Sequence, residues 1–217
     1  MIKLDRDQDV FVLRMNDNEN RFSPDMLEAF DAALTVVEST EGPNALVTTG
    51  TDKFFSNGLD LNWLGANPSE ATEYLGRIHQ LFARYLRLPC ATVAASNGHT
   101  YAAGAMLAIC HDHRIMRTDR GYWCLPEVDL GMSFTTGMNA LIPALLPTRT
   151  AHEAMVTGRR YTAADALAAG IVDAVGAEAE VLPQAVAAAQ ALAGKASPAI
   201  ATIRTTLYAP VLTALAQ

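Results

Sequence analysis

Two glycine-centred turns contain the backbone groups of this 217-residue chain that could do chemistry. Each turn follows a short apolar and β-branched run that is typical of a strand: 45–49 precedes the turn at 54–61, and 92–95 precedes the turn at 96–105. A turn that leads from a strand into a helix exposes backbone N–H groups where the helix dipole favours negative charge. Two such turns side by side predict a two-donor site for an oxyanion, which small residues allow a ligand carbonyl to approach.

Glu127 is the side chain best suited to act as a base. It lies among apolar neighbours, after Pro126, and burial raises the pKa of a carboxyl group towards the range that proton transfer near neutral pH requires. A surface acid at the end of a strand is the alternative, and this is the usual place for a glutamate. Asp129 lies two residues later and shares the same face of an extended segment, so it is a candidate second acid or hydrogen-bond partner.

Further motifs lie along the chain in an order that resembles one known family. The first turn, Phe-Phe-Ser-Asn-Gly-Leu-Asp-Leu, is followed by Asn97-Gly98 with Gly104, and then by Asp119-Arg120-Gly121, 127–131 and 201–208. This order resembles the crotonase (enoyl-CoA hydratase/isomerase) superfamily over nearly the whole chain. The stretches at 53–58, 97–99 and 126–129 are most similar to those of the plant-type peroxisomal Δ3,Δ2-enoyl-CoA isomerases.

The resemblance implies a fold and a reaction. The fold is α/β, a crotonase (ClpP-like) spiral of ββα units in a single domain 1–217, with the spiral over about 1–160 and a C-terminal helical region over about 161–217. In this superfamily two backbone N–H groups bind a thioester oxygen and stabilise an enolate. By position, the resemblance assigns the oxyanion donors to Leu59 and Ala103 and the catalytic glutamate to Glu127. Coenzyme A is part of the substrate, so no separate cofactor is implied.

Met106 stands where the hydratases of the superfamily carry a second glutamate. A methionine can neither give nor take a catalytic proton and makes a site drier, so a single carboxylate that moves a proton from C2 to C4 is favoured. We therefore predict isomerisation of 3-enoyl-CoA to 2-enoyl-CoA in fatty acid β-oxidation. Core packing would also explain Met106. The alternatives are a hydratase that uses Glu127 with water and a non-catalytic acyl-CoA-binding paralogue.

The other candidate residues are assigned to the acyl pocket or to coenzyme A. The pocket is expected to include Phe55, Asn57, Gly58, Asp60, Trp63, Gly104, Met106 and Asp129. Phosphate or adenine contacts are expected from Arg21, Phe22, Lys53 and Arg204. A solvated charge would explain each of the three cations as well, and a hydrophobic staple onto Leu27 would explain Phe22. His111 and His113 have no third ligand nearby, so no metal site is predicted.

Composition restricts the class of protein and its partners. Half of the residues are hydrophobic and 18% are charged, which is typical of a globular chain, and the net charge of −7 disfavours nucleic acid and anionic membranes. The charged start at 1–7 does not resemble a signal peptide, and a turn at 96–99 interrupts the uncharged run 88–111. The three cysteines have no metal-type spacing and are expected to be reduced. We therefore expect a cytoplasmic bacterial enzyme.

Several helices must position these residues. Ser23 and Pro24 predict the start of a helix that buries Leu27, Phe30, Leu34 and Val37, and 69–86 predicts a second amphipathic helix. A capping-box start at 162–165, a strand at 171–175 and helices at 181–193 and 198–207 follow. Strands that alternate with helices favour an α/β arrangement. The resemblance implies that the helical tail forms a homotrimer or a dimer of trimers.

Overall fold

Two β-sheets form the framework of the computed structural model, which describes residues 1–217. The larger sheet has the order β1-β2-β3-β5-β7-β9, with β1 Ile2–Asp7, β2 Val10–Met15, β3 Ala45–Thr49, β5 Ala91–Ser96, β7 His113–Arg117 and β9 Ala174–Gly176. Only the β1–β2 pair is antiparallel. The smaller sheet is parallel and contains β4 Phe54–Ser56, β6 His99–Tyr101 and β8 Trp123–Cys124.

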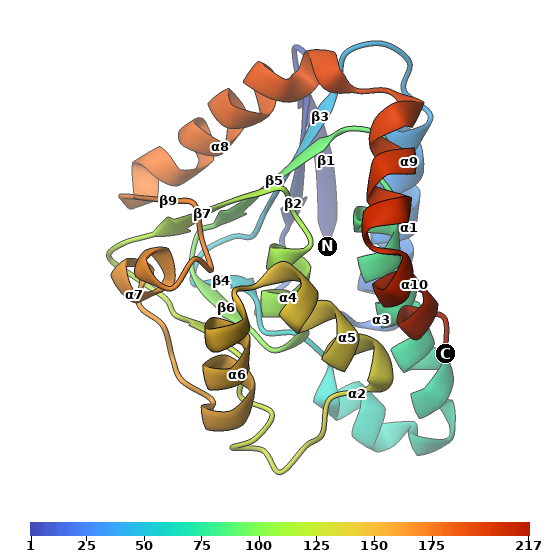
Figure 1. Cartoon of the computed structure of the whole chain (residues 1–217), viewed down its shortest axis with the longest axis vertical. Helices are drawn as coiled ribbons and strands as arrows, with labels where there is room; N and C mark the ends of the chain where they lie inside the picture. Colours follow the sequence, from blue (N-terminus) through green and yellow to red (C-terminus); the bar gives the residue numbers. More distant parts are fainter.

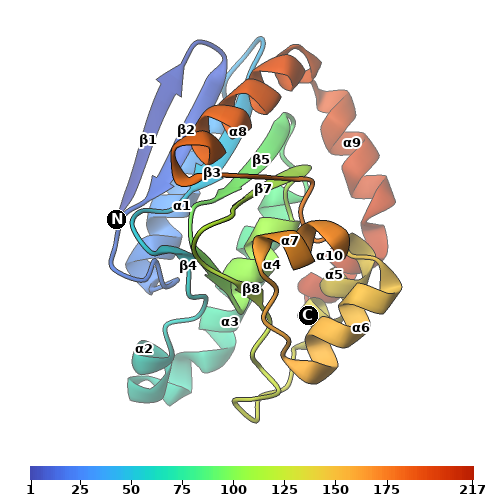
Figure 2. The same cartoon turned by 90° about the vertical axis from the view of Figure 1, so that its left-hand side faces the viewer.

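Three consecutive units repeat the same order of elements. In each unit a strand of the large sheet is followed by a strand of the small sheet and then by helix: β3 and β4 lead to α2 Leu61–Ala66 and α3 Ala71–Tyr85, β5 and β6 to α4 Ala103–Ile109, and β7 and β8 to α5 Thr136–Leu145. Figure 2 shows these units stacked beside one another. The arrangement is the α/β spiral of ββα units that the family resemblance implied.

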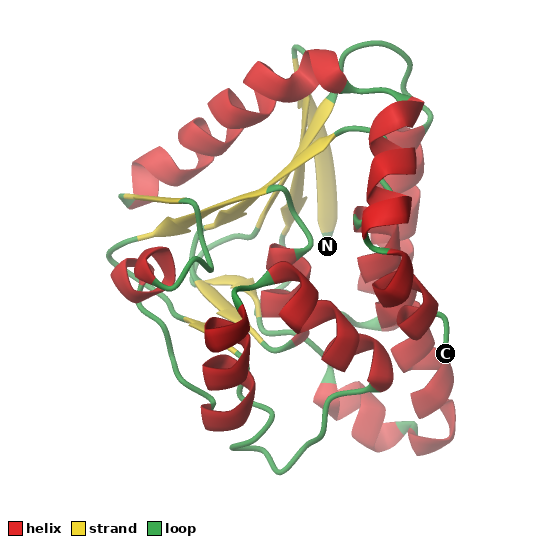
Figure 3. Cartoon of the chain, viewed as in Figure 1, coloured by secondary structure: helices red, strands yellow, loops and turns green.

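Helices cover both faces of the large sheet, as Figures 1 and 3 show. Alternate strand residues face opposite sides, so Phe11 and Leu13 join a core of 46 residues while Val10 and Val12 join a second core of 12. The smaller core is closed by α8 Glu178–Leu192. The larger core includes residues of α1 Pro24–Glu38, α3, α4, α5 and α10 Ala209–Leu215, and it lies behind both glycine-centred turns.

Helix starts agree with the predicted capping residues. The Ser23 hydroxyl accepts a hydrogen bond from the Met26 N–H at 3.2 Å at the start of α1. Thr162 and Asp165 form the capping box of α7 Ala163–Ala168. The predicted strand at 171–175 begins later, at Ala174, because the N–H groups of Ile171 and Val172 donate to the Ala166 carbonyl at the end of α7.

The C-terminal region is helical and returns to the rest of the molecule. It contains α6 Thr148–Thr157, α7, α8, α9 Pro198–Leu207 and α10, and short 3-10 turns occur at Pro68–Glu70 and Ala193–Lys195. Sequence reasoning did not identify α10, which packs against α5 and α3 and so supports the third unit of the spiral. None of the helices has the length and apolar character needed to cross a membrane.

Candidate active site

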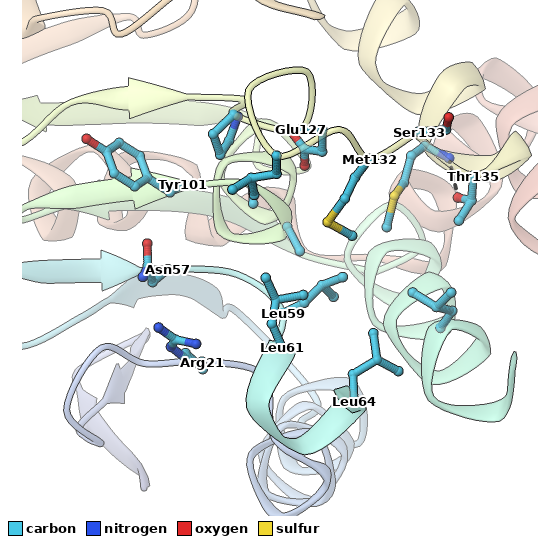
Figure 4. Close-up of a pocket in the computed structure, with 16 residues that line it drawn as sticks. Arg21, Asn57, Leu59, Leu61, Leu64, Tyr101, Glu127, Met132, Ser133 and Thr135 are labelled. Carbon is cyan, nitrogen blue, oxygen red and sulfur yellow. Dashed lines mark hydrogen bonds between the residues drawn. The ribbon is translucent and has the colours of Figure 1, made fainter. Parts of the chain in front are cut away.

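A pocket of about 400 Å³ lies where the two glycine-centred turns meet (Figure 4). Ten of its 16 lining residues are hydrophobic. The full set is Arg21, Asn57, Leu59, Leu61, Leu64, Leu75, Tyr101, Ala102, Ala103, Pro126, Glu127, Leu130, Met132, Ser133, Thr135 and Met138. The predicted base and both predicted oxyanion donors therefore share one cavity.

The two turns touch each other directly at Gly58. Its φ is +79°, and a Cβ added there would lie 2.8 Å from the Ala103 nitrogen and 2.9 Å from the Ala102 Cβ. Only glycine allows this approach, which makes Leu59 and Ala103 neighbours across the joint. No group of the chain accepts a hydrogen bond from the N–H of either residue. Both N–H groups are therefore available to a ligand oxygen.

Ala102 holds the second turn in an unusual conformation. Its φ of 51° and ψ of −126° lie in a region that L residues rarely adopt, and it directly precedes the first residue of α4. Its N–H donates to the Cys124 carbonyl at 3.0 Å, and its carbonyl accepts from the Met106 N–H at 3.0 Å. Bonds on both sides thus fix the turn that presents Ala103. Sequence reasoning missed this strain because no glycine stands at this position.

Glu127 is a lone buried carboxyl group in the wall opposite Leu59 (Figure 4). The residue is 7% exposed, and its Oε2 atom has no hydrogen-bond partner. Burial raises the pKa of Glu127 from 4.5 to about 7, with a smaller opposing effect from its own backbone. Such a group can both take and return a proton near neutral pH. It is the only acidic side chain among the lining residues.

Asp129 does not share the face of Glu127, so this prediction is wrong. The segment after Pro126 is a tight turn rather than an extended strand, since the Pro126 carbonyl accepts from the N–H groups of Asp129 and Leu130. The turn directs Asp129 away from the pocket and towards Gly158, where a Cβ would lie 2.9 Å from the Asp129 carboxylate. Asp129 is exposed and cannot act as a second acid in this cavity.

Met106, Phe55 and Gly104 lie behind the pocket rather than in its wall. Met106 and Phe55 are completely buried in the larger core. Gly104 lets α4 approach β4, because a Cβ there would lie 2.6 Å from the Ser56 carbonyl oxygen. The prediction that Met106 lines the site is therefore wrong, and its packing role explains it. The wall of the pocket nevertheless contains no carboxylate other than that of Glu127, as the methionine at position 106 suggested.

Asp60 and Trp63 also lie outside the cavity, and they organise the first turn. The Asp60 carboxylate accepts from the Trp63 N–H at 3.0 Å and caps α2, while the Asp60 N–H donates to the Tyr74 hydroxyl at 2.9 Å. The Trp63 and Tyr74 rings are in contact, with centroids 5.0 Å apart. Asn57 is the remaining pocket candidate, and it does line the cavity.

The four predicted coenzyme A contacts divide into two groups. Arg21 lines one end of the pocket, near Asn57 and Tyr101 (Figure 4), and its guanidinium bonds Glu19 at 2.7 Å. Hydrogen bonds from Arg21 and then from Asn57 lower the pKa of Glu19, so Glu19 stays ionised and paired with Arg21. Lys53 is exposed and forms no ion pair. Arg21 and Lys53 therefore stay predicted phosphate contacts, although Lys53 does not line the pocket.

Phe22 and Arg204 cannot bind coenzyme A in this structure. Phe22 is completely buried and packs edge to face on Phe30, with ring centroids 5.9 Å apart. Arg204 is 9% exposed, and its guanidinium donates to the Leu88 carbonyl at 2.6 Å and to the Cys90 carbonyl at 2.9 Å. It also pairs with Asp112. Both residues hold the core together, so these two predictions are wrong.

Comparisons with known proteins give the same family and fold as the motifs. The family model described as enoyl-CoA hydratase/isomerase matches residues 5–217. The peroxisomal enoyl-CoA delta isomerase 2 of Arabidopsis thaliana is 37% identical over 96% of this chain and 92% of its own length. Enoyl-CoA delta isomerase 3 of the same plant is 35% identical with the same coverage. A structure described as a probable enoyl-CoA hydratase from Mycobacterium tuberculosis has a TM-score of 0.90 at 29% identity, covering 99% of this chain and 91% of that one.

Proposed function

Because the chain belongs to the enoyl-CoA hydratase/isomerase family, we propose that it is an enoyl-CoA isomerase that converts a 3-enoyl-CoA thioester to the 2-enoyl form. One observation carries the proposal: Glu127 is the only carboxyl group in an apolar pocket that also contains two unbonded backbone N–H groups. The names of the Arabidopsis relatives support the same reaction class.

In the proposed mechanism the two N–H groups act on the thioester oxygen. Leu59 and Ala103 donate to this oxygen and stabilise the negative charge that develops when C2 loses a proton. One such donor contributes about 3 kcal/mol to the stability of the transition state. The Glu127 carboxylate takes the proton from C2, and the electron pair of the broken C–H bond forms a C1–C2 double bond while the C=O π electrons move onto the thioester oxygen. The product is a dienolate in which C1–C2 is conjugated with the C3–C4 double bond.

The same carboxyl group then completes the reaction. Glu127 returns its proton to C4: the electron pair of the C3–C4 double bond forms the new C4–H bond, the C1–C2 pair becomes the C2–C3 double bond, and the thioester carbonyl re-forms. No atom is gained or lost overall. A carboxyl group whose pKa is about 7 is a stronger base than an exposed glutamate and still releases its proton. The proposed chemistry uses the groups of the chain and the thioester alone.

Water addition is the competing reaction, and the pocket offers little support for it. A hydratase must orient a water molecule, whereas no second acid lines this cavity and most of the wall is apolar.

We propose that Arg21 and Lys53 meet the coenzyme A phosphates at the polar end. We also propose a trimer or a dimer of trimers, because Ile203 and Leu207 of α9 are 64% and 65% exposed.

The deciding experiment gives purified protein matched 3-enoyl-CoA and 2-enoyl-CoA substrates and follows double-bond migration and water addition separately. We expect isomerisation to exceed hydration, and Glu127→Gln to abolish it while the thioester still binds. Hydration that equals or exceeds isomerisation in the unmodified protein would refute the isomerase assignment in favour of the hydratase. Binding without either reaction would support a non-catalytic paralogue.

A further inference from the structure

The Leu59 N–H, one of the two proposed oxyanion donors, belongs to a peptide unit whose carbonyl is held by another segment of the chain. That carbonyl is the one of Gly58, and it accepts a hydrogen bond from the Phe22 N–H at 2.8 Å. The C=O and N–H groups of a trans peptide unit lie in one plane and point in opposite directions. The bond from Phe22 therefore fixes the direction of the Leu59 N–H in the pocket wall (Figure 4).

A single hydroxyl group, that of Tyr74 on α3, joins the two segments that form this arrangement. It donates to the Phe22 carbonyl at 2.8 Å and accepts from the Asp60 N–H at 2.9 Å. Phe22 holds the Gly58 carbonyl, and Asp60 directly follows Leu59 in the chain. The hydroxyl group thus fixes both peptide units that flank Leu59, one of them directly and the other through Phe22.

The surroundings of Tyr74 keep this hydroxyl group protonated and in place. The residue is 2% exposed, and its ring contacts the ring of Trp63. Burial raises the pKa of Tyr74 to about 12, with a smaller opposing effect from the hydrogen bond of Asp60. The phenol therefore keeps the proton that it donates to Phe22. Tyr74 does not line the pocket, so it can act on the substrate only through the backbone of the turn.

The two proposed donors differ in the support that they receive from their own helices. Ala103 is the first residue of α4, and the carbonyl of its peptide unit, that of Ala102, accepts from the Met106 N–H at 3.0 Å within this helix. Leu59 lies just before α2, which has six residues and buries none of them. Such a short, exposed helix is only marginally stable by itself. The position of the Leu59 N–H therefore depends on bonds from other parts of the chain.

We propose that Tyr74 is a positioning residue for the oxyanion site, and that its hydroxyl group holds the Leu59 N–H where the thioester oxygen binds. The proposal rests on the proposed function and adds to it a residue that lies outside the pocket. The alternative is that the hydroxyl group only stabilises the fold. In that case its removal would weaken the fold without changing how the pocket binds a carbonyl oxygen.

The test is Tyr74→Phe, which removes one oxygen atom and keeps the ring against Trp63. Binding is measured for a saturated acyl-CoA thioester and for the S-alkyl-CoA thioether of the same length, which lacks the carbonyl oxygen. We expect the unmodified protein to bind the thioester at least about tenfold more tightly, because two N–H groups bind its oxygen. In Tyr74→Phe this preference should fall about threefold or more, and kcat for isomerisation should fall at least about tenfold with a smaller change in KM.

Tyr85→Phe is the matched control. Tyr85 lies on the same helix and is completely buried, but its hydroxyl group bonds that of Thr48 on β3, at 2.9 Å, rather than the turn. The control should lower the midpoint of urea unfolding about as much as Tyr74→Phe does, because each variant loses one buried hydroxyl group. It should leave kcat and the preference for the thioester within about twofold of the unmodified protein.

An unchanged preference for the thioester in Tyr74→Phe would overturn the proposal, and so would equal effects of the two variants on this preference. Replacement of Tyr74 by 4-aminophenylalanine keeps the donor but supplies a poorer acceptor, so its preference should be intermediate. If Tyr74→Phe does not fold, a full preference in the 4-aminophenylalanine protein would overturn the proposal instead. Equal binding of thioester and thioether to the unmodified protein would refute the oxyanion site of the proposed function rather than the role of Tyr74.

Discussion

Removing the charge of Glu127 should make the protein more stable and inactive at the same time. The folded state raises the pKa of this carboxyl group from 4.5 to about 7, because the group is buried and Oε2 has no partner. Below pH 4.5 the glutamate is protonated in both the folded and the unfolded state. Between these values the folded state binds more protons, so the free energy of unfolding falls as the pH rises. Above pH 7 both states are charged and the full cost of the buried charge remains.

The size of the effect follows from the shift. The rise of the Glu127 pKa from 4.5 to about 7, at about 1.4 kcal/mol per pKa unit, corresponds to about 3 kcal/mol. Glu127→Gln keeps the shape of the side chain but cannot ionise, so it avoids this cost. Relative to the variant, the unmodified protein should lose about 3 kcal/mol between pH 4.5 and pH 7.5, which is roughly 6–12 °C in melting temperature for a chain of this size.

Thermal unfolding of both proteins across this pH range measures the difference. A control substitution, Glu180→Gln, changes an exposed glutamate at the start of α8 and should keep the pH dependence of the unmodified protein, because it retains Glu127. A difference between the unmodified protein and Glu127→Gln that stays constant from pH 4.5 to pH 7.5 would show that the carboxyl group is well solvated. The physical argument for its role as a base would then fail.

Four further predictions concern the rate of the reaction and the stability of the fold. Glu127→Gln should lower the rate of isomerisation at least about a hundredfold, and in the unmodified protein the rate should rise with pH as the carboxylate forms near pH 7; a full rate in the variant would exclude Glu127 as the base. Ala102→Gly should raise the free energy of unfolding by about 1 kcal/mol because glycine adopts this backbone freely, whereas Ala105→Gly, inside α4, should lower it by at least about 1 kcal/mol; urea unfolding of both measures the signs. Arg204→Met should lower the free energy of unfolding by about 3 kcal/mol in the same assay, since it removes the ion pair with Asp112 and leaves two carbonyl groups without their donor, and KM should not change; a raised KM with unchanged stability would make Arg204 a binding residue. Met106→Glu should destabilise the chain by several kcal/mol rather than create a hydratase, because it places a charge in the core.

The parts of the site that the sequence predicted are those encoded locally. Gly58 and Glu127 stand in short motifs, and the strand, turn and helix around each are set by neighbouring residues. The predictions failed where distant contacts decide the outcome. Arg204 bonds the carbonyl of Leu88, 116 residues earlier, and no local pattern distinguishes that role from phosphate binding. Asp129 was misplaced because a segment with alternating residues was read as a strand, although the Pro126 carbonyl closes a turn there.

The apolar wall of the pocket could not be assembled from sequence for a related reason. Leu75 and Met138 come from helices of different units, and their side chains face the same cavity only after the spiral has formed. Amphipathic spacing predicted the helix that carries Leu75 but not which of its residues meets the ligand. Met106 lies one turn along α4 from Ala103, and both side chains belong to the core, so only the backbone N–H of Ala103 is available to the pocket.

Each of the three ββα units contributes a different group to the proposed chemistry. The first unit supplies Leu59, the second supplies Ala103, and Glu127 follows β8 of the third. Gly58 and Ala102 join the first two units, and the third unit holds this joint through the Cys124 carbonyl of β8 rather than through Glu127. A substitution at Glu127 can therefore change the acid or base of the pocket while the N–H groups of Leu59 and Ala103 keep their positions.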